Sequence, residues 1–108
     1  MAFILVSYKI EDYKRWKNTF NDAFEMRRKF GERSSRVFKC SDNPKEMVVL
    51  QEWDSLASAR RFTKSRELRN CMKKAGVVGK PDIIFLKEIS LPIASLHVIN
   101  FQALNPLV

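Results

Sequence analysis

The chain has 108 residues, of which 45% are hydrophobic and only three are glycine. This length and apolar content fit one folded domain and exclude a disordered or fibrous chain. Lys and Arg number 20 against 12 Asp and Glu, which gives a formal net charge of +8. Because most basic residues fall in two predicted helices, we interpret them as a solvated outer face and do not expect nucleic acid as a partner.

Cysteine, histidine and the N-terminal pattern bear on metal binding and location. Cys40 and Cys71 lack the short spacing of a redox or zinc motif, and His97 is the only histidine. We therefore expect no metal. The first residues place an apolar run before the charges, the reverse of a secretory signal, and no apolar stretch is long enough for a bilayer. We expect a cytoplasmic protein with no membrane partner.

The first half of the chain predicts a strand followed by a helix. Residues 3–8 are β-branched and aromatic and too few for a helix, so they predict the first strand. Asp12 is a suitable N-cap, and apolar residues then recur at three- and four-residue steps as far as Arg27. Gly31 supplies a stop, so we expect one helix from Asp12 to Gly31.

The second half predicts a hairpin, a second helix and a last strand. Residues 35–40 and 47–53 resemble strands on either side of turn-forming residues. A second helix begins after residue 54, has a break at Ser65 and is ended by Gly76 and Gly79. The apolar run at 83–86 then predicts the fourth strand.

The order βαββαβ predicts an α+β, ferredoxin-like fold, a four-stranded antiparallel sheet with two helices on one face. Strands one, three and four are apolar on both alternating sets, and two helices can cover only one side. The other side would expose an apolar surface too large for a monomer. We therefore expect a homodimer through the sheet face, with a barrel-like interior between the two sheets.

The predicted domain covers residues 1–90, and residues 91–108 form an uncharged, apolar C-terminal extension. Residues 98–101 could add an edge strand or lie across a partner chain. A partly disordered apolar end is the alternative, and the sequence leaves both open.

Few residues suggest chemistry, because the chain has no glycine-rich phosphate loop and no nucleophile elbow. Glu52 could act as a base or acceptor beside Trp53 as a stacking wall, and Tyr8 and Trp16 could donate hydrogen bonds. Arg36 could pair with an anionic ligand. The pocket candidates are therefore Tyr8, Trp16, Arg36, Phe38, Glu52, Trp53, Phe62 and Phe85. Ordinary packing or exposure is the alternative for each of them.

Two stretches resemble a known family. The run Tyr-Lys-Ile-Glu-Asp-Tyr-Lys-Arg-Trp at 8–16 resembles the opening of dimeric α/β-barrel proteins. The Glu-Trp-Asp run at 52–54, with Ala59 and Phe62, and residues 67–79 resemble small uncharacterised relatives of the antibiotic biosynthesis monooxygenases. These motifs encode caps, core aromatics and turns rather than a reacting group.

The resemblance implies a βαββαβ dimer, the dimeric α/β barrel, with a pocket between sheet and helices in each subunit. Some relatives oxidise aromatic polyketides with dioxygen and neither metal nor flavin, and others degrade haem. The haem-degrading relatives place a His on the second helix at the position of Phe62, so the resemblance implies no haem and no other cofactor here.

The leading hypothesis is a small-molecule-binding homodimer, a cofactor-independent monooxygenase acting on an aromatic or apolar metabolite. A non-catalytic binding or assembly module of the same fold is the alternative. A deep cavity with at least two convergent polar side chains would favour the enzyme, and a cavity filled by Phe and Trp would favour the module.

Overall fold

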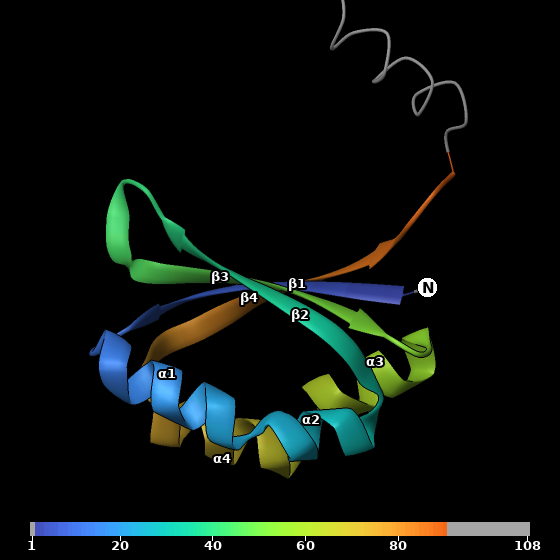
Figure 1. Cartoon of the computed structure of the whole chain (residues 1–108), viewed down its shortest axis with the longest axis horizontal. Coiled ribbons are helices and arrows are strands. Elements are labelled where there is room, and N and C mark those ends of the chain that lie inside the picture. The colour runs from blue at the N-terminus through green and yellow to red at the C-terminus, as the bar shows by residue number, and fades with distance from the viewer. Residues whose placement is uncertain (1, 91–108) are drawn as a thin grey trace, which may run out of the picture.

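The computed structural model of the chain describes residues 2–90 and contains one four-stranded antiparallel sheet with four helices on one side (Figure 1). The elements are β1 (Ala2–Ile10), α1 (Tyr13–Asp22), α2 (Phe24–Phe30), β2 (Glu32–Cys40), β3 (Asn43–Trp53), α3 (Leu56–Thr63), α4 (Arg66–Ala75) and β4 (Val77–Lys87). The strand order is β2-β3-β1-β4. This confirms the predicted α+β, ferredoxin-like fold. The predicted extension, 91–108, lies outside the described residues.

The first predicted helix is two helices, α1 and α2. Asp12 caps α1 as expected, because its Oδ2 accepts from the Arg15 backbone N–H at 3.0 Å. The helix breaks at Ala23, close to a side-chain contact: the Phe20 carbonyl accepts from Nη1 of Arg27 at 2.7 Å. A continuous helix would direct that carbonyl at the backbone of Phe24.

The second predicted helix breaks at Ser65, as expected. The hydroxyl oxygens of Ser55 and Ser65 accept from backbone N–H groups at the starts of α3 and α4. Gly76 ends α4 with φ 78°, in the left-handed region that favours glycine.

β4 is longer than predicted, because Gly79 lies inside the strand instead of before it. Gly79 has φ 74°, and the pairing of β1 with β4 shifts register between Ser7 and Lys9. Such an irregularity lets a strand continue through residues that would otherwise end it. The strand therefore runs from Val77 to Lys87.

The two faces of the sheet differ in what covers them. Alternate residues of β3 from Met47 to Trp53 are buried beneath the helices, and their neighbours are only half-buried. The residues between them face the side without helices, which we call the open face (Figure 1).

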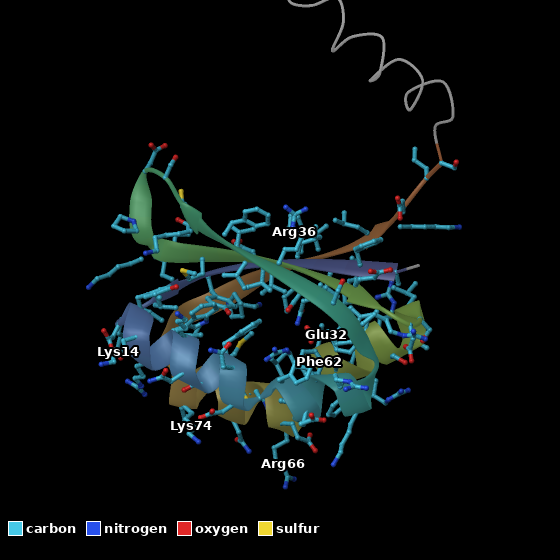
Figure 2. All side chains as sticks on the ribbon, in the orientation of Figure 1. Lys14, Glu32, Arg36, Phe62, Arg66 and Lys74 are labelled. Atoms are coloured by element: carbon cyan, nitrogen blue, oxygen red, sulfur yellow. The ribbon has the colours of Figure 1, made fainter. Side chains whose placement is uncertain are left out.

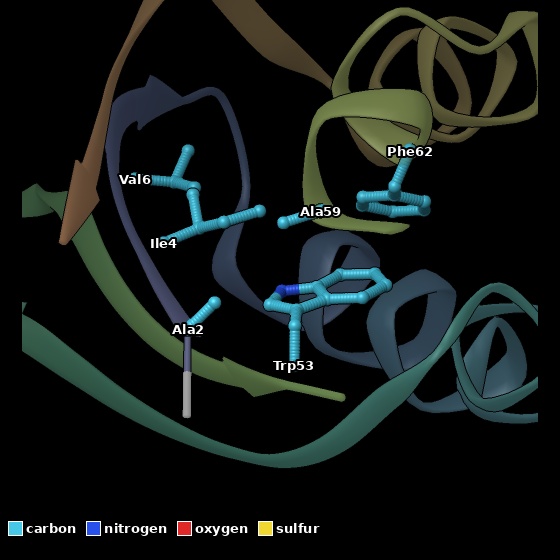
Figure 3. Packing of buried hydrophobic residues seen from close by; sticks show 6 residues of the cluster. All are labelled: Ala2, Ile4, Val6, Trp53, Ala59 and Phe62. Carbon is cyan, nitrogen blue, oxygen red and sulfur yellow. The ribbon is translucent and has the colours of Figure 1, made fainter. Parts of the chain in front are cut away.

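The core under α3 is built around Trp53. Its side chain is fully buried against Ile4, Ala59 and Phe62 (Figure 3). The rings of Trp53 and Phe62 lie 4.8 Å apart between centroids, a distance at which aromatic side chains attract one another. A second cluster around Trp16 and Met47 fills the other end of the same layer, beneath α1.

Candidate functional site

A cavity of about 60 Å³ lies between the sheet and the helices. Its floor comes from inward residues of β1 and β3, and its sides come from α1, α2, α3 and α4. We call it the inner cavity. Three of the predicted pocket candidates line it: Tyr8, Trp16 and Phe62.

Most of the inner cavity is apolar. Val6 and Val49 project from the strands, and Phe20, Met26 and Met72 project from the helices. Methionine side chains are flexible and tolerate irregular neighbours. The two methionines therefore allow the cavity to adjust its shape.

Tyr8 and Trp16 form a hydrogen-bonded pair at one wall. The indole Nε1 of Trp16 donates to the phenolic oxygen of Tyr8 at 2.8 Å. Burial raises the pKa of the Tyr8 phenol from 10.0 to about 12, against the opposing effects of the Trp16 hydrogen bond and the Arg27 charge. The phenol therefore keeps its proton at neutral pH and acts as a hydrogen-bond donor.

Arg27 and Glu32 form a buried ion pair at the other side. The side chains are 6% and 2% exposed, and Nε of Arg27 donates to both carboxylate oxygens of Glu32, at 3.0 and 3.1 Å. Glu32 also accepts from Nε2 of Gln51 at 2.8 Å. These bonds hold all three side chains in place, because each side chain has at least one hydrogen-bond partner within the group.

Hydrogen-bonding capacity remains on this network. Among the described residues, neither the hydroxyl hydrogen of Tyr8 nor Nη2 of Arg27 has an acceptor, and Oε1 of Gln51 has no donor. All three residues line the inner cavity. Two donors and one acceptor are therefore available to a ligand in an apolar surrounding, an arrangement typical of small-molecule sites.

Two other predicted pocket candidates lie in the core. Trp53 is 0% exposed beneath α3, and its Nε1 has no hydrogen-bond partner among residues 2–90. Phe85 packs against the same cluster under the guanidinium of Arg60, 4.6 Å from the ring centroid. Neither residue lines the inner cavity.

The remaining three candidates lie on the open face. Arg36 is paired with Leu50 in the sheet register and lies on the side away from the helices (Figure 2). Phe38 is 45% exposed beside it, with the Arg36 guanidinium 5.4 Å from its ring centroid. Glu52 accepts from the hydroxyl of Ser34 at 3.1 Å. Strand alternation separates all three from the inner cavity.

Sequence analysis missed Arg27, Glu32 and Gln51 as site residues. Two signals were available. Arg27 occupies an apolar position in the helical repeat, and Gln51 stands between Val49 and Trp53 at an inward position of its strand. A polar residue at a core position needs a partner, and such residues often mark a site.

No group of three or more His, Cys, Asp or Glu side chains among residues 2–90 could hold a metal ion. Within the same range, no helix has the length and apolar character needed to cross a membrane.

Comparison with known sequences identifies the family. The sequence profile described as "Antibiotic biosynthesis monooxygenase" matches residues 4–74. The chain belongs to this family. No curated protein matches the chain.

Solved structures of antibiotic biosynthesis monooxygenases share the fold. A candidate member from Bordetella bronchiseptica superposes with a TM-score of 0.70 at 9% identity, over 82% of this chain and 97% of that chain. SnoaB from Streptomyces nogalater, described as a cofactor-independent oxygenase, has a TM-score of 0.65 at 10% identity, over 84% and 96%. A conserved protein from Methanosarcina mazei has 0.65 at 16% identity, over 82% and 94%. Identities this low establish the shared fold alone.

Proposed function

We propose that the protein is a homodimeric, cofactor-independent monooxygenase that oxidises a small hydroxylated aromatic compound in the inner cavity. One observation carries the proposal: Tyr8, Arg27 and Gln51 line one largely apolar cavity, and each keeps a donor or acceptor without a partner among residues 2–90. Membership of the family and the fold shared with SnoaB support the reaction class.

The reaction needs no external reductant. A phenol has the electrons required: one atom of dioxygen enters the ring as a second carbonyl oxygen, and the other leaves as water with two substrate hydrogens. Tyr8 and Nη2 of Arg27 would donate to the phenolic oxygen of the substrate. They would stabilise negative charge as it develops there, in the manner of an oxyanion hole.

The substrate would have to lose its phenolic proton without a carboxylate or histidine base from residues 2–90. Among residues 2–90, no His, Asp or Glu lines the inner cavity, and Glu32 is bonded to Arg27 and Gln51 as their acceptor. The substrate would enter as the neutral phenol, and its proton would leave to water as negative charge develops in the transition state.

The size of the cavity points to a small substrate. Its volume, about 60 Å³, exceeds the roughly 15 Å³ needed for one water but is well below the roughly 300 Å³ of common ligand pockets. A single aromatic ring would enter only if Met26 and Met72 moved aside. The same small volume favours the second candidate function, a non-catalytic binding or assembly module.

The open face supports the homodimer. Its centre is formed by half-buried Phe3, Leu5 and Leu50, and at one edge Ile84 and Leu86 are 52% and 39% exposed. Pairing with a second copy across a two-fold axis would remove this apolar surface from water.

Oxygen consumption in the presence of hydroxylated aromatic compounds tests the enzymatic proposal. We expect uptake with at least one compound, and a fall in kcat on the order of 10² in Tyr8→Phe, since a donor to the developing charge is lost. Tyr13→Phe is the matched control, because Tyr13 is 42% exposed and lies outside the cavity lining. No uptake with any such compound would leave the non-catalytic module as the explanation.

A further inference from the structure

We propose, resting on the proposed function for the location of the site, that the inner cavity selects small aromatic ligands with a neutral oxygen acceptor, such as a ketone, over aromatic carboxylates. A buried arginine would ordinarily suggest a site for anions. Here the carboxylate of Glu32 already pairs with the buried arginine, Arg27.

Two of the three nitrogen atoms of Arg27 have acceptors within the protein. Nε donates to both oxygens of Glu32, and Nη1 donates to the Phe20 carbonyl at 2.7 Å. The guanidinium carbon lies 3.8 Å from the centroid of the Phe20 ring. These contacts fix the guanidinium and leave Nη2 to a ligand.

The charges near this nitrogen sum to zero. Glu32 neutralises Arg27, and among the described residues no other charged side chain lines the inner cavity. An entering carboxylate would bring a second negative charge close to Glu32 without a second positive one. Burying such an unpaired charge costs much free energy, whereas burying a neutral carbonyl costs little when it is hydrogen-bonded.

The hydroxyl of Tyr8 is a second donor that favours a neutral oxygen acceptor. The oxygen of Tyr8 accepts the Trp16 indole hydrogen, so its own hydrogen is available to a ligand oxygen. Arg27 and Tyr8 line the same cavity. A single carbonyl oxygen, with two lone pairs, could accept from both.

The apolar walls define the rest of the ligand. Phe20 and Phe62 line the cavity with Met26 and Met72, and aromatic rings and thioethers pack well against a flat ring. Once Met26 and Met72 move aside, the site would therefore match a single-ring aromatic ketone. Benzoate has nearly the same shape as acetophenone and differs in its charge, so these two compounds isolate the electrostatic preference.

The two tryptophans provide an internal reporter and its control. Trp16 borders the cavity, whereas the Trp53 indole is 0% exposed in the core. In a two-dimensional NMR titration of the 15N-labelled protein, a ligand in the cavity would shift the Trp16 indole signal and leave the Trp53 signal in place. Anions attracted to the basic helix surface would shift neither.

We expect acetophenone to shift the Trp16 signal saturably. We expect benzoate to bind at least about tenfold more weakly than acetophenone. Glu32→Gln keeps an acceptor for Arg27 but removes the negative charge. In this variant the affinity ratio should move at least about tenfold toward benzoate. Equal or tighter binding of benzoate to the unaltered protein would overturn the proposal, as would an unchanged ratio in the variant or no shift with either compound.

A second variant keeps the test decisive if Glu32→Gln fails to fold. Tyr8→Phe removes one donor, so the affinity for acetophenone should fall several-fold, and Tyr13→Phe should leave it unchanged. Equal affinity in Tyr8→Phe would overturn the two-donor site. These readouts are independent of oxygen uptake, so acetophenone binding without turnover would refute the enzyme and leave the ligand selectivity standing.

Discussion

At the scale of single residues, the Tyr8 phenol links stability to pH. Its pKa is about 12 in the folded protein against 10.0 for the ordinary group, so the folded state holds this proton more tightly. The corresponding stability is fully present below pH 10 and is lost as the pH rises through about 12. Two pKa units correspond to about 3 kcal/mol.

We predict that raising the pH from below 10 to near 12 lowers the free energy of unfolding more for the unaltered protein than for Tyr8→Phe. Urea unfolding of the two proteins at each pH measures the difference, and titration of the lysines cancels between them. Parallel pH dependences would mean that the Tyr8 phenol is solvated.

Within residues 2–90, two Arg–Glu pairs lie in different surroundings, and their contributions to stability should differ. Arg27 and Glu32 are buried, whereas the side chains of Arg15 and Glu11 are 49% and 64% exposed at a separation of 3.3 Å. Removing one partner of a buried pair leaves the other charge unpaired in the interior.

We predict that Glu32→Ala lowers the free energy of unfolding by about 3–5 kcal/mol, and that Glu11→Ala lowers it by about 0–1 kcal/mol. Chemical denaturation with a common baseline measures both. Similar losses in the two variants would show that the Glu32 environment is open to water.

Among the aromatic pocket candidates, Tyr8, Trp16 and Phe62 line the inner cavity, whereas Phe38, Trp53 and Phe85 do not. The polar lining residues Arg27 and Gln51 were not predicted as site residues. Tyr8 and Trp16 follow from their place on the first strand and helix. The pairing of Arg27 with Glu32 joins a helix to the next strand across Gly31, and the approach of Gln51 comes from another strand. Contacts of that kind depend on tertiary packing, which a one-dimensional pattern does not contain.

At the scale of elements, glycines decide where segments end and how they turn. Gly31 joins α2 to β2 with φ 123°, and a Cβ there would lie 2.6 Å from Oδ1 of Asp54. Gly79 has φ 74°, but a Cβ there would meet no atom within 4 Å. At both positions the backbone conformation would strain any residue other than glycine. Of the two, only Gly31 would also bring the added Cβ into a clash.

We predict that Gly31→Ala lowers the free energy of unfolding more than Gly79→Ala, which should lose about 1–2 kcal/mol from backbone strain alone. Thermal or urea unfolding of both variants measures the difference. A larger loss at Gly79 would indicate that the shift between β1 and β4 tolerates less change than the α2–β2 turn.

Some ends of helices and strands can be predicted from local sequence, and others cannot. The cap at Asp12 and the break at Ser65 depend on local hydrogen bonds and were predicted from the sequence. The break at Ala23 accompanies the contact of Arg27 with Phe20, and the length of β4 depends on its pairing with β1. Those two features arise from neighbours in space.

At the scale of the whole molecule, the two faces of the sheet differ in what covers them. The helices cover one face of the sheet and leave the other open (Figure 1). The core and the inner cavity lie on the covered side. The sequence predicted two apolar faces on the inner strands. Only the structure shows that Val49 faces the helices and Leu50 faces the open side.

We predict that Leu50→Asp converts a dimer into monomers or aggregates, because a carboxylate would be buried at the centre of the proposed interface. Leu56→Asp is the matched control, since Leu56 is 44% exposed at the start of α3. Light scattering after size-exclusion chromatography gives the mass. An unchanged mass in Leu50→Asp would place the interface elsewhere.

The central claim is that the inner cavity binds an aromatic ligand through its oxygen atom. A crystal structure of the protein with acetophenone tests it most directly. We predict the ring among Phe20, Phe62 and the two methionines, with the ketone oxygen roughly 3 Å from the Tyr8 hydroxyl oxygen and Nη2 of Arg27. An empty cavity at saturating ligand, or a ring bound with its oxygen turned away from both donors, would contradict the account.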